Sequence, residues 1–148
     1  MGVRFLIVLC VLAGVARGDN AVLVKQYTGR IVISPDSPPT TQSELAEYVK
    51  ANAVAGDHYE LIKGSPWSLN LVGVLAKQAP GQTVQLVIVE TTPKASPLVT
   101  LDVRATERLV ITSSKLTTAA GFESNKTYAV RLVRGTTVLA KAELKLRE

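Results

Sequence analysis

Apolar residues recur along most of this chain in short runs that either alternate with polar residues or stay apolar throughout. Such runs are typical of β-strands. From residue 58 onward the runs follow one another, separated by Gly, Pro, Asn and Ser, at 58–63, 68–77, 83–90, 98–106, 108–112, 127–133 and 138–146. Because no helical pattern interrupts them, the sequence predicts a mainly β protein, an antiparallel β-sandwich of about eight or nine strands with one short α-helix.

The apolar runs differ in how many of their faces they bury. Residues 69–76 and 84–89 are apolar on both faces, which predicts central strands. In 99–104, Val99, Leu101 and Val103 alternate with polar residues, so this strand is expected to have one wet face.

The last two strands carry enough pattern to predict a register. Placing the apolar alternation of both strands on the core side sets Leu132 opposite Val138 and makes 134–136 the loop. The side chains predicted to point outward are Arg131, Lys141, Glu143 and Lys145.

The segment before residue 58 has a different organisation. Residues 21–33 are predicted to form one or two strands, and the proline-rich stretch 34–41 a stiff connector. Helical spacing of apolar residues predicts a helix over 42–54, with Thr41 and Glu44 in capping-box positions and Gly56 as a left-handed stop.

The first eighteen residues have the pattern of a secretory signal peptide. Arg4 precedes the apolar run 5–15, and the small residues Ala16 and Gly18 precede the expected cleavage before Asp19. The sequence therefore predicts a secreted or periplasmic protein, a single domain over 19–148 and no transmembrane anchor in the mature chain.

Composition narrows the expected setting and partners. Cys10, the only cysteine, lies in the signal segment, so the mature chain has no cysteine, which favours a bacterial envelope protein. The net charge of +5 becomes +3 without the signal, too mild to indicate nucleic-acid binding. The charge is uneven, −2 over 19–93 and +5 over 94–148, so the final hairpin is expected to present a basic outer face.

No residue cluster matches a catalytic, metal or cofactor motif, and we expect a protein that is not an enzyme. His58 and Glu60 would share one side of a strand, but two ligands make a poor zinc site. Trp67 is open to two interpretations: buried, it would pin the core, and exposed near Tyr59, it would be a platform for sugar stacking. Asn125 begins a glycosylation sequon, which marks its loop as exposed.

The tail resembles a known kind of domain. Gly121, Tyr128, the alternating Val130 and Leu132, a glycine-containing turn and a closing amphipathic strand are similar to the final hairpin of immunoglobulin or fibronectin type III sandwiches. The resemblance covers about thirty residues, 116–146, and implies a fold class only, because such sandwiches serve many functions.

These observations favour an exported, non-catalytic protein-interaction or structural module of the cell envelope or extracellular space. The expected partner is another envelope or extracellular protein or a second copy of the chain, with polysaccharide as a further option; strand donation by 21–33 is one route to assembly. The alternative is a carbohydrate or small-ligand binder using Trp67 and nearby loops. The candidate contact residues are Tyr59, Trp67, Arg131, Lys141 and Lys145.

Overall fold

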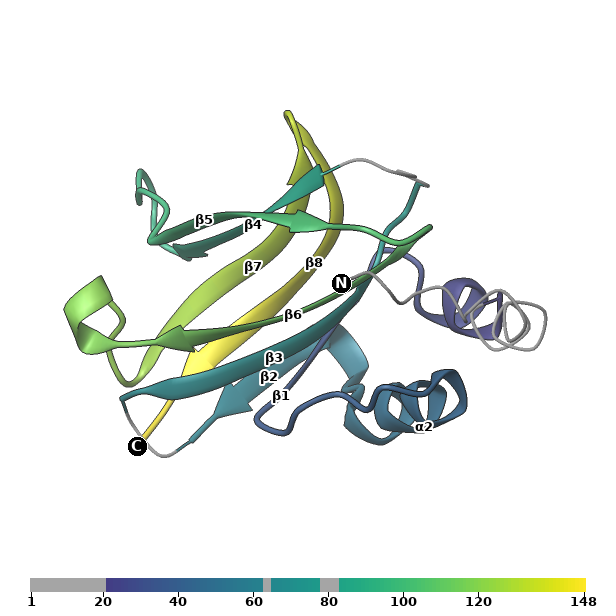
Figure 1. Cartoon of the computed structure of the whole chain (residues 1–148). Coiled ribbons are helices and arrows are strands. Elements are labelled where there is room, and N and C mark those ends of the chain that lie inside the picture. The colour runs from purple at the N-terminus through teal and green to yellow at the C-terminus, as the bar shows by residue number, and fades with distance from the viewer. Residues whose placement is uncertain (1–20, 63–64, 78–82) are drawn as a thin grey trace, which may run out of the picture.

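A computed structural model of the chain describes residues 21–62, 65–77 and 83–148. The described part is mainly β, and its strands form two sheets (Figure 1). The strands are β1 (Ile31–Ser34), β2 (His58–Leu61), β3 (Trp67–Val74), β4 (Thr83–Glu90), β5 (Val99–Arg104), β6 (Leu109–Leu116), β7 (Lys126–Arg134) and β8 (Thr137–Leu146). The helices are α2 (Gln42–Asn52), the short 3-10 turns η1 (Ala55–Asp57) and η2 (Thr118–Ala120), and a helical segment at 21–27. The predicted signal peptide lies outside the described residues.

One sheet has the order β1-β3-β6 and the other the order β2-β8-β7-β4-β5. The strands predicted from residue 58 onward are all present, although the end of the first falls on residue 63, outside the described part. The two runs predicted to be central occupy interior positions, β3 in the smaller sheet and β4 in the larger. One pairing was not expected: β2 lies parallel to β8, whereas the other strand pairs are antiparallel.

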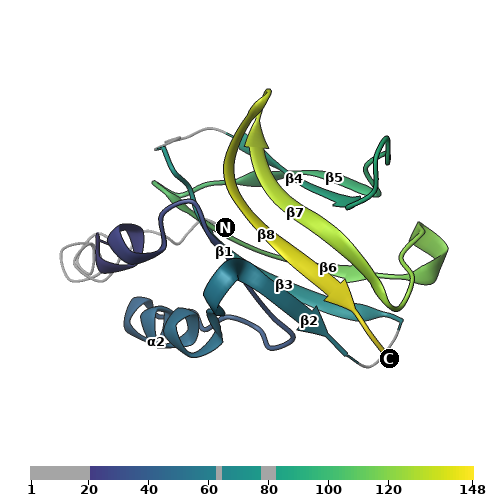
Figure 2. The ribbon, with the colours of Figure 1, turned by 180° about the vertical axis from the view of Figure 1, so that it is seen from behind.

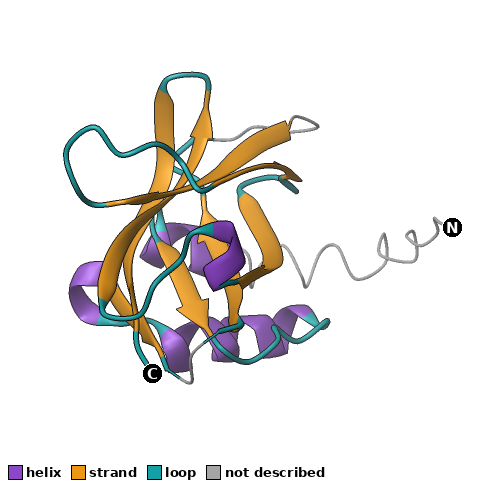
Figure 3. Cartoon of the chain, turned by 90° about the vertical axis from the view of Figure 1, so that its left-hand side faces the viewer, coloured by secondary structure: helices purple, strands orange, loops and turns teal. Residues whose placement is uncertain are grey.

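The hydrophobic core lies between the two sheets. Figure 3 shows the sheets from the side, with α2 along the lower edge. Alternate residues of β4, β7 and β8 point inward and are buried, among them Leu86, Val130 and Leu144. The sheets contact each other at Gly73 of β3, where a Cβ atom would meet Leu132 Cδ1 of β7 at 2.3 Å. A side chain at position 73 would therefore force either the Leu132 side chain or the sheets themselves to move.

The prediction of one or two strands over 21–33 holds only for the end of this segment. Residues 21–27 are helical, and only Ile31–Ser34 forms a strand. Within 21–27, the residues that are buried or packed against the core are Leu23, Val24 and Tyr27, and they fall on one helical face. β1 pairs with β3 of its own chain and is buried along its whole length, so it is a core strand rather than one donated to a neighbour.

The helix predicted over 42–54 is confirmed as α2, with its end two residues earlier. Thr41 is the N-cap residue as predicted, but its side chain does not bond the helix backbone; its Oγ1 donates a hydrogen bond of 2.6 Å to Glu44 Oε1 instead. Leu45 and Val49 are buried on the side facing β1. Gly56 does adopt a left-handed conformation, with φ of +82°, but within η1 rather than at the end of α2.

The predicted register of the last hairpin is wrong by two residues. Leu132 lies opposite Ala140, and Arg134 opposite Thr137, so the loop contains only Gly135 and Thr136. A β-bulge allows this short turn while the apolar residues of both strands still face the core. Leu139 is the extra residue of the bulge and is buried. Val138, which was predicted to face the core, is 45% exposed. Gly135 at φ +64° suits a tight two-residue hairpin turn.

Two core tyrosines should make the protein less stable in alkali. Burial raises the pKa of Tyr59 and of Tyr128 above the ordinary value. As pH rises, the tyrosines of the unfolded chain therefore lose their phenol protons before those of the folded chain do. The stability that the two protonated tyrosines contribute is complete below about pH 10 and is lost as pH rises through the folded-state pKa values. Urea unfolding across this range should show the decline, and a Tyr59→Phe/Tyr128→Phe variant should show a shallower one. An equal decline in both proteins would contradict this origin.

Candidate functional site

The side of the five-stranded sheet that faces away from the smaller sheet is the candidate binding surface; we call it the outer face. Its side chains come from alternate positions of the strands: Thr100 and Asp102 on β5; Gln85, Val87 and Val89 on β4; Ala129, Arg131 and Val133 on β7; Lys141, Glu143 and Lys145 on β8; His58 and Glu60 on β2. In Figure 2, β7 and β8 cross the front of the molecule, and none of the described helices is drawn over them.

The outer face has an apolar part and a charged part. Val87, Val89 and Val133 are half-buried, and Ala129, which lies opposite Val89, is only 8% exposed. These residues lie on β4 and β7, whereas β8 and β2 carry mostly charged side chains. An apolar patch beside a polar, charged margin is the usual anatomy of a protein–protein interface.

Strand register places two cations side by side where these parts meet. Arg131 of β7 lies directly opposite Lys141 of β8, and Val87 of β4 lies on the other side of Arg131. Directly opposed like charges repel each other across a strand pair. Both side chains are exposed, and among the described residues neither forms a salt bridge.

A shallow groove of about 310 Å³ opens at this pair of cations. Besides Arg131 and Lys141, it is lined by the side chains of Asp57, His58, Thr91 and Glu143. The parallel pairing of β2 with β8 brings His58 opposite Glu143, and η1 delivers Asp57 to the same place.

Both carboxylates of the groove already have cationic or hydrogen-bonding partners. Asp57 Oδ1 accepts a hydrogen bond of 2.7 Å from Arg30 Nε, and this bond raises the pKa of Arg30. Glu143 Oε1 lies 2.7 Å from His58 Nδ1. Both acids that line the groove are therefore engaged by Arg30 or His58, whereas Arg131 and Lys141 form no salt bridge within the described residues.

Of the basic residues predicted as contacts, Arg131 and Lys141 come together in the groove and Lys145 does not. Lys145 is half-buried and lies opposite Glu60 of β2, whose carboxylate pairs with Arg147 at 3.1 Å. Arg131, Lys141 and Glu143 are exposed as predicted.

Tyr59 and Trp67 are core residues and cannot form an exposed platform for a sugar. Trp67 is 2% exposed, and its Nε1 donates a hydrogen bond of 2.9 Å to the carbonyl of Arg147. Tyr59 is 5% exposed, and its hydroxyl accepts a hydrogen bond from the backbone N–H of Val54. Both indole and phenol thus have their polar atoms satisfied inside the protein, which leaves the core interpretation of Trp67.

His58 takes part in a solvated contact with a carboxylate. Its side chain is 68% exposed, and it contacts Glu143 rather than Glu60. Within residues 21–62, 65–77 and 83–148, no group of three His, Cys, Asp or Glu side chains is placed to hold a metal ion. The sequence did not reveal the contributions of Asp57 and Glu143 to the groove, because the β2–β8 pairing joins segments far apart in the chain.

A second groove, of about 440 Å³, lies on the smaller sheet. Its polar side chains bond one another: Ser113 Oγ donates to Asn70 Oδ1 at 2.9 Å, and Lys115 Nζ donates to Ser68 Oγ at 2.7 Å. Asn70 also donates to the carbonyl of Pro35. These groups have partners within the protein, in contrast to the two cations of the outer face.

Comparison with known proteins does not assign the chain to a family. No protein-family model matches the sequence, and no curated protein is significantly similar to it. None of the helices in the described part of the chain has the length and apolar character needed to cross a membrane.

Proposed function

We propose that this chain is an exported, non-catalytic protein-interaction module that binds an acidic protein through the outer face. The observation that carries the proposal is the Arg131–Lys141 pair, which lies beside a half-buried apolar patch. Neither cation forms a salt bridge with a carboxylate of the described residues. An acidic partner would relieve the repulsion between the two cations while it covers the valines of β4 and β7.

The strand order supports an immunoglobulin-like scaffold for this module. The orders β1-β3-β6 and β8-β7-β4-β5 correspond to A-B-E and G-F-C-C′ of immunoglobulin sandwiches, with β2 as an added strand beside β8. Tyr128 near the start of β7 accepts a hydrogen bond of 2.9 Å from the backbone N–H of Glu123, five residues upstream, which is the contact of a tyrosine corner. Scaffolds of this kind hold surface residues rigidly, and their functions reside in the faces and loops they present.

The non-catalytic part of the proposal draws support from His58. His58, the one histidine of the chain, is exposed and contacts the exposed carboxylate of Glu143. Catalytic acids and bases are usually partly buried, whereas the side chain of His58 is largely in contact with solvent. The export part rests on the signal-like pattern of residues 1–18.

Capture of partners by matched variants tests the proposal. The full chain, tagged at its C terminus, is incubated with native envelope and culture fractions, and retained proteins are quantified by mass spectrometry. Val87→Asp puts an acidic group on the outer face, and Ile111→Asp makes the same kind of change on the smaller sheet, where Ile111 is 48% exposed. We expect an acidic protein to be retained by the native chain and by Ile111→Asp, and to be reduced about tenfold by Val87→Asp, as for a central contact.

Thermal unfolding of both variants shows whether each remains folded. Equal retention by the native chain and Val87→Asp, or equal loss in both folded variants, would contradict a binding surface on the outer face.

A further inference from the structure

The groove on the outer face holds two cations that the protein itself does not neutralise. Arg131 and Lys141 lie opposite each other across β7 and β8. Arg30 forms an isolated parallel β-bridge with Lys141, so a third cationic residue lies beside them. Arg30 is paired with Asp57, but in the part of the chain that the structure describes Arg131 and Lys141 have no such partner. Among these three cations of the described part, Arg131 and Lys141 are therefore the ones without a salt-bridge partner.

The groove has room for a group that bridges the two cations. Its volume of about 310 Å³ is bounded by Thr91 at one side and by the His58–Glu143 pair at the other. A guanidinium binds a planar carboxylate through two parallel hydrogen bonds, and an ammonium adds a third from a neighbouring position. Arg131 and Lys141 together offer this set of donors.

We propose that this groove is a carboxylate-binding subsite, which receives a Glu or Asp side chain from an acidic segment of the protein partner. The inference rests on the proposed function, and it names the chemistry by which the partner is recognised. The acidic side chain bridges Arg131 and Lys141, while neighbouring parts of the partner cover Val87 and Val133.

The charges around the groove favour a singly charged ligand. Glu143 and Asp57 also line it, so two cations face the ligand in the presence of two acids. With Asp57 matched by Arg30, the charges of Arg131, Lys141 and Glu143 sum to +1, which one carboxylate balances. A phosphate, with nearly two negative charges, would meet more repulsion from Glu143 and Asp57.

Titration with short peptides, followed by NMR of the labelled full chain, tests the subsite. The probes are acetyl-hexaglutamate amide, the neutral acetyl-hexaglutamine amide and a phosphoserine peptide of the same length. We expect saturable shifts from hexaglutamate at the amides of Ala129–Arg131 and Lys141–Glu143 and at Arg131 Nε. Hexaglutamine should cause none of these shifts, and the phosphoserine peptide should bind more weakly than hexaglutamate.

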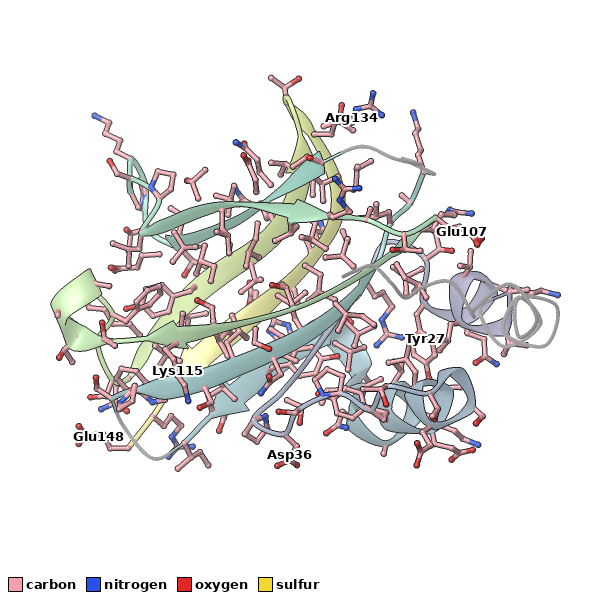
Figure 4. The ribbon with its side chains drawn as sticks, viewed as in Figure 1. Tyr27, Asp36, Glu107, Lys115, Arg134 and Glu148 are labelled. Carbon is pink, nitrogen blue, oxygen red and sulfur yellow. The ribbon has the colours of Figure 1, made fainter. Side chains whose placement is uncertain are left out.

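Matched variants separate the groove from general basicity. Arg131→Gln and Lys141→Gln should each weaken hexaglutamate binding about fivefold, the size expected for a surface ion pair. Arg134→Gln at the tip of the β7–β8 hairpin and Lys115→Gln on β6 of the smaller sheet (Figure 4) remove the same charges outside the groove, and both should bind like the native chain.

The inference is overturned if hexaglutamate causes shifts elsewhere, if all four variants weaken binding equally, or if the phosphoserine peptide binds more tightly at the groove. Its failure differs from a failure of the proposed function. Capture that still depends on Val87 while hexaglutamate does not bind the groove would keep the outer face as the interface and remove the carboxylate subsite.

Discussion

Replacing Trp67 with alanine should lower the free energy of unfolding by about 3–5 kcal/mol, the range for removing a large aromatic side chain from a core. Trp67 is 2% exposed and lies opposite Leu116 in the smaller sheet. The substitution leaves a cavity, and it also leaves the carbonyl of Arg147 without the hydrogen bond that Nε1 donates. Urea unfolding followed by far-UV circular dichroism measures the loss.

Trp67→Phe serves as the matched control. It keeps a ring in the core but removes the Nε1–H donor, so we expect a smaller loss of about 1–2 kcal/mol, close to that of one buried hydrogen bond with some lost volume. The native protein should show the blue-shifted fluorescence of a buried indole, and glycans should not change it. An emission typical of exposed tryptophan, or a loss below about 1 kcal/mol in Trp67→Ala, would contradict a core position.

Adding one methyl group at Gly73 should lower the free energy of unfolding by about 1–3 kcal/mol, the usual cost of overpacking a core. The new Cβ would lie 2.3 Å from Leu132 Cδ1 if neither sheet moved, far inside van der Waals contact. Gly73 is on the middle strand of the smaller sheet, paired with Ile31 and Val110, so its backbone cannot shift without disturbing both neighbours.

A double-mutant cycle with Leu132→Ala identifies the cause. Leu132→Ala alone should cost about 2–5 kcal/mol because it creates a cavity between the sheets. In Gly73→Ala/Leu132→Ala, the added methyl enters the space that the leucine leaves, so the double variant should lose less stability than the two single variants together. Losses that simply add would mean that Gly73 and Leu132 do not meet.

Local patterns in the sequence were sufficient to predict most of the strands and α2. Period-two alternation depends on neighbouring residues only, and in 126–134 it separates the inward Tyr128, Val130 and Leu132 from the outward Arg131. Thr41 and Glu44 likewise marked the start of α2. The outward position of Arg131 and Lys141, and hence the basic part of the candidate site, followed from the same alternation.

Features that depend on distant segments could not be predicted in this way. Residues 21–27 read as a strand because Val22 and Val24 alternate, but Leu23, Val24 and Tyr27 pack as one face of a helix. The bulge at Leu139 is a single inserted residue that alternation cannot detect when both neighbours are also apolar or small.

The groove itself depended on the least predictable pairing. β2 pairs in parallel with β8, a strand far away in the sequence, and this contact brings Asp57 and His58 beside Lys141 and Glu143. The burial of Trp67 has a similar origin, because its indole reaches the carbonyl of Arg147 at the far end of the chain.

The central claim is that the outer face binds an acidic protein, and lysine acylation rates in the complex test it most directly. Four lysines lie on different surfaces of the protein: Lys141 in the groove, Lys50 on α2, Lys94 in the loop before β5 and Lys115 on β6 (Figure 4). With the captured partner bound, we expect acylation of Lys141 to slow strongly while Lys50, Lys94 and Lys115 react as in the free protein. Protection of Lys50 or Lys115 with Lys141 still reactive would place the interface on another surface and contradict the account.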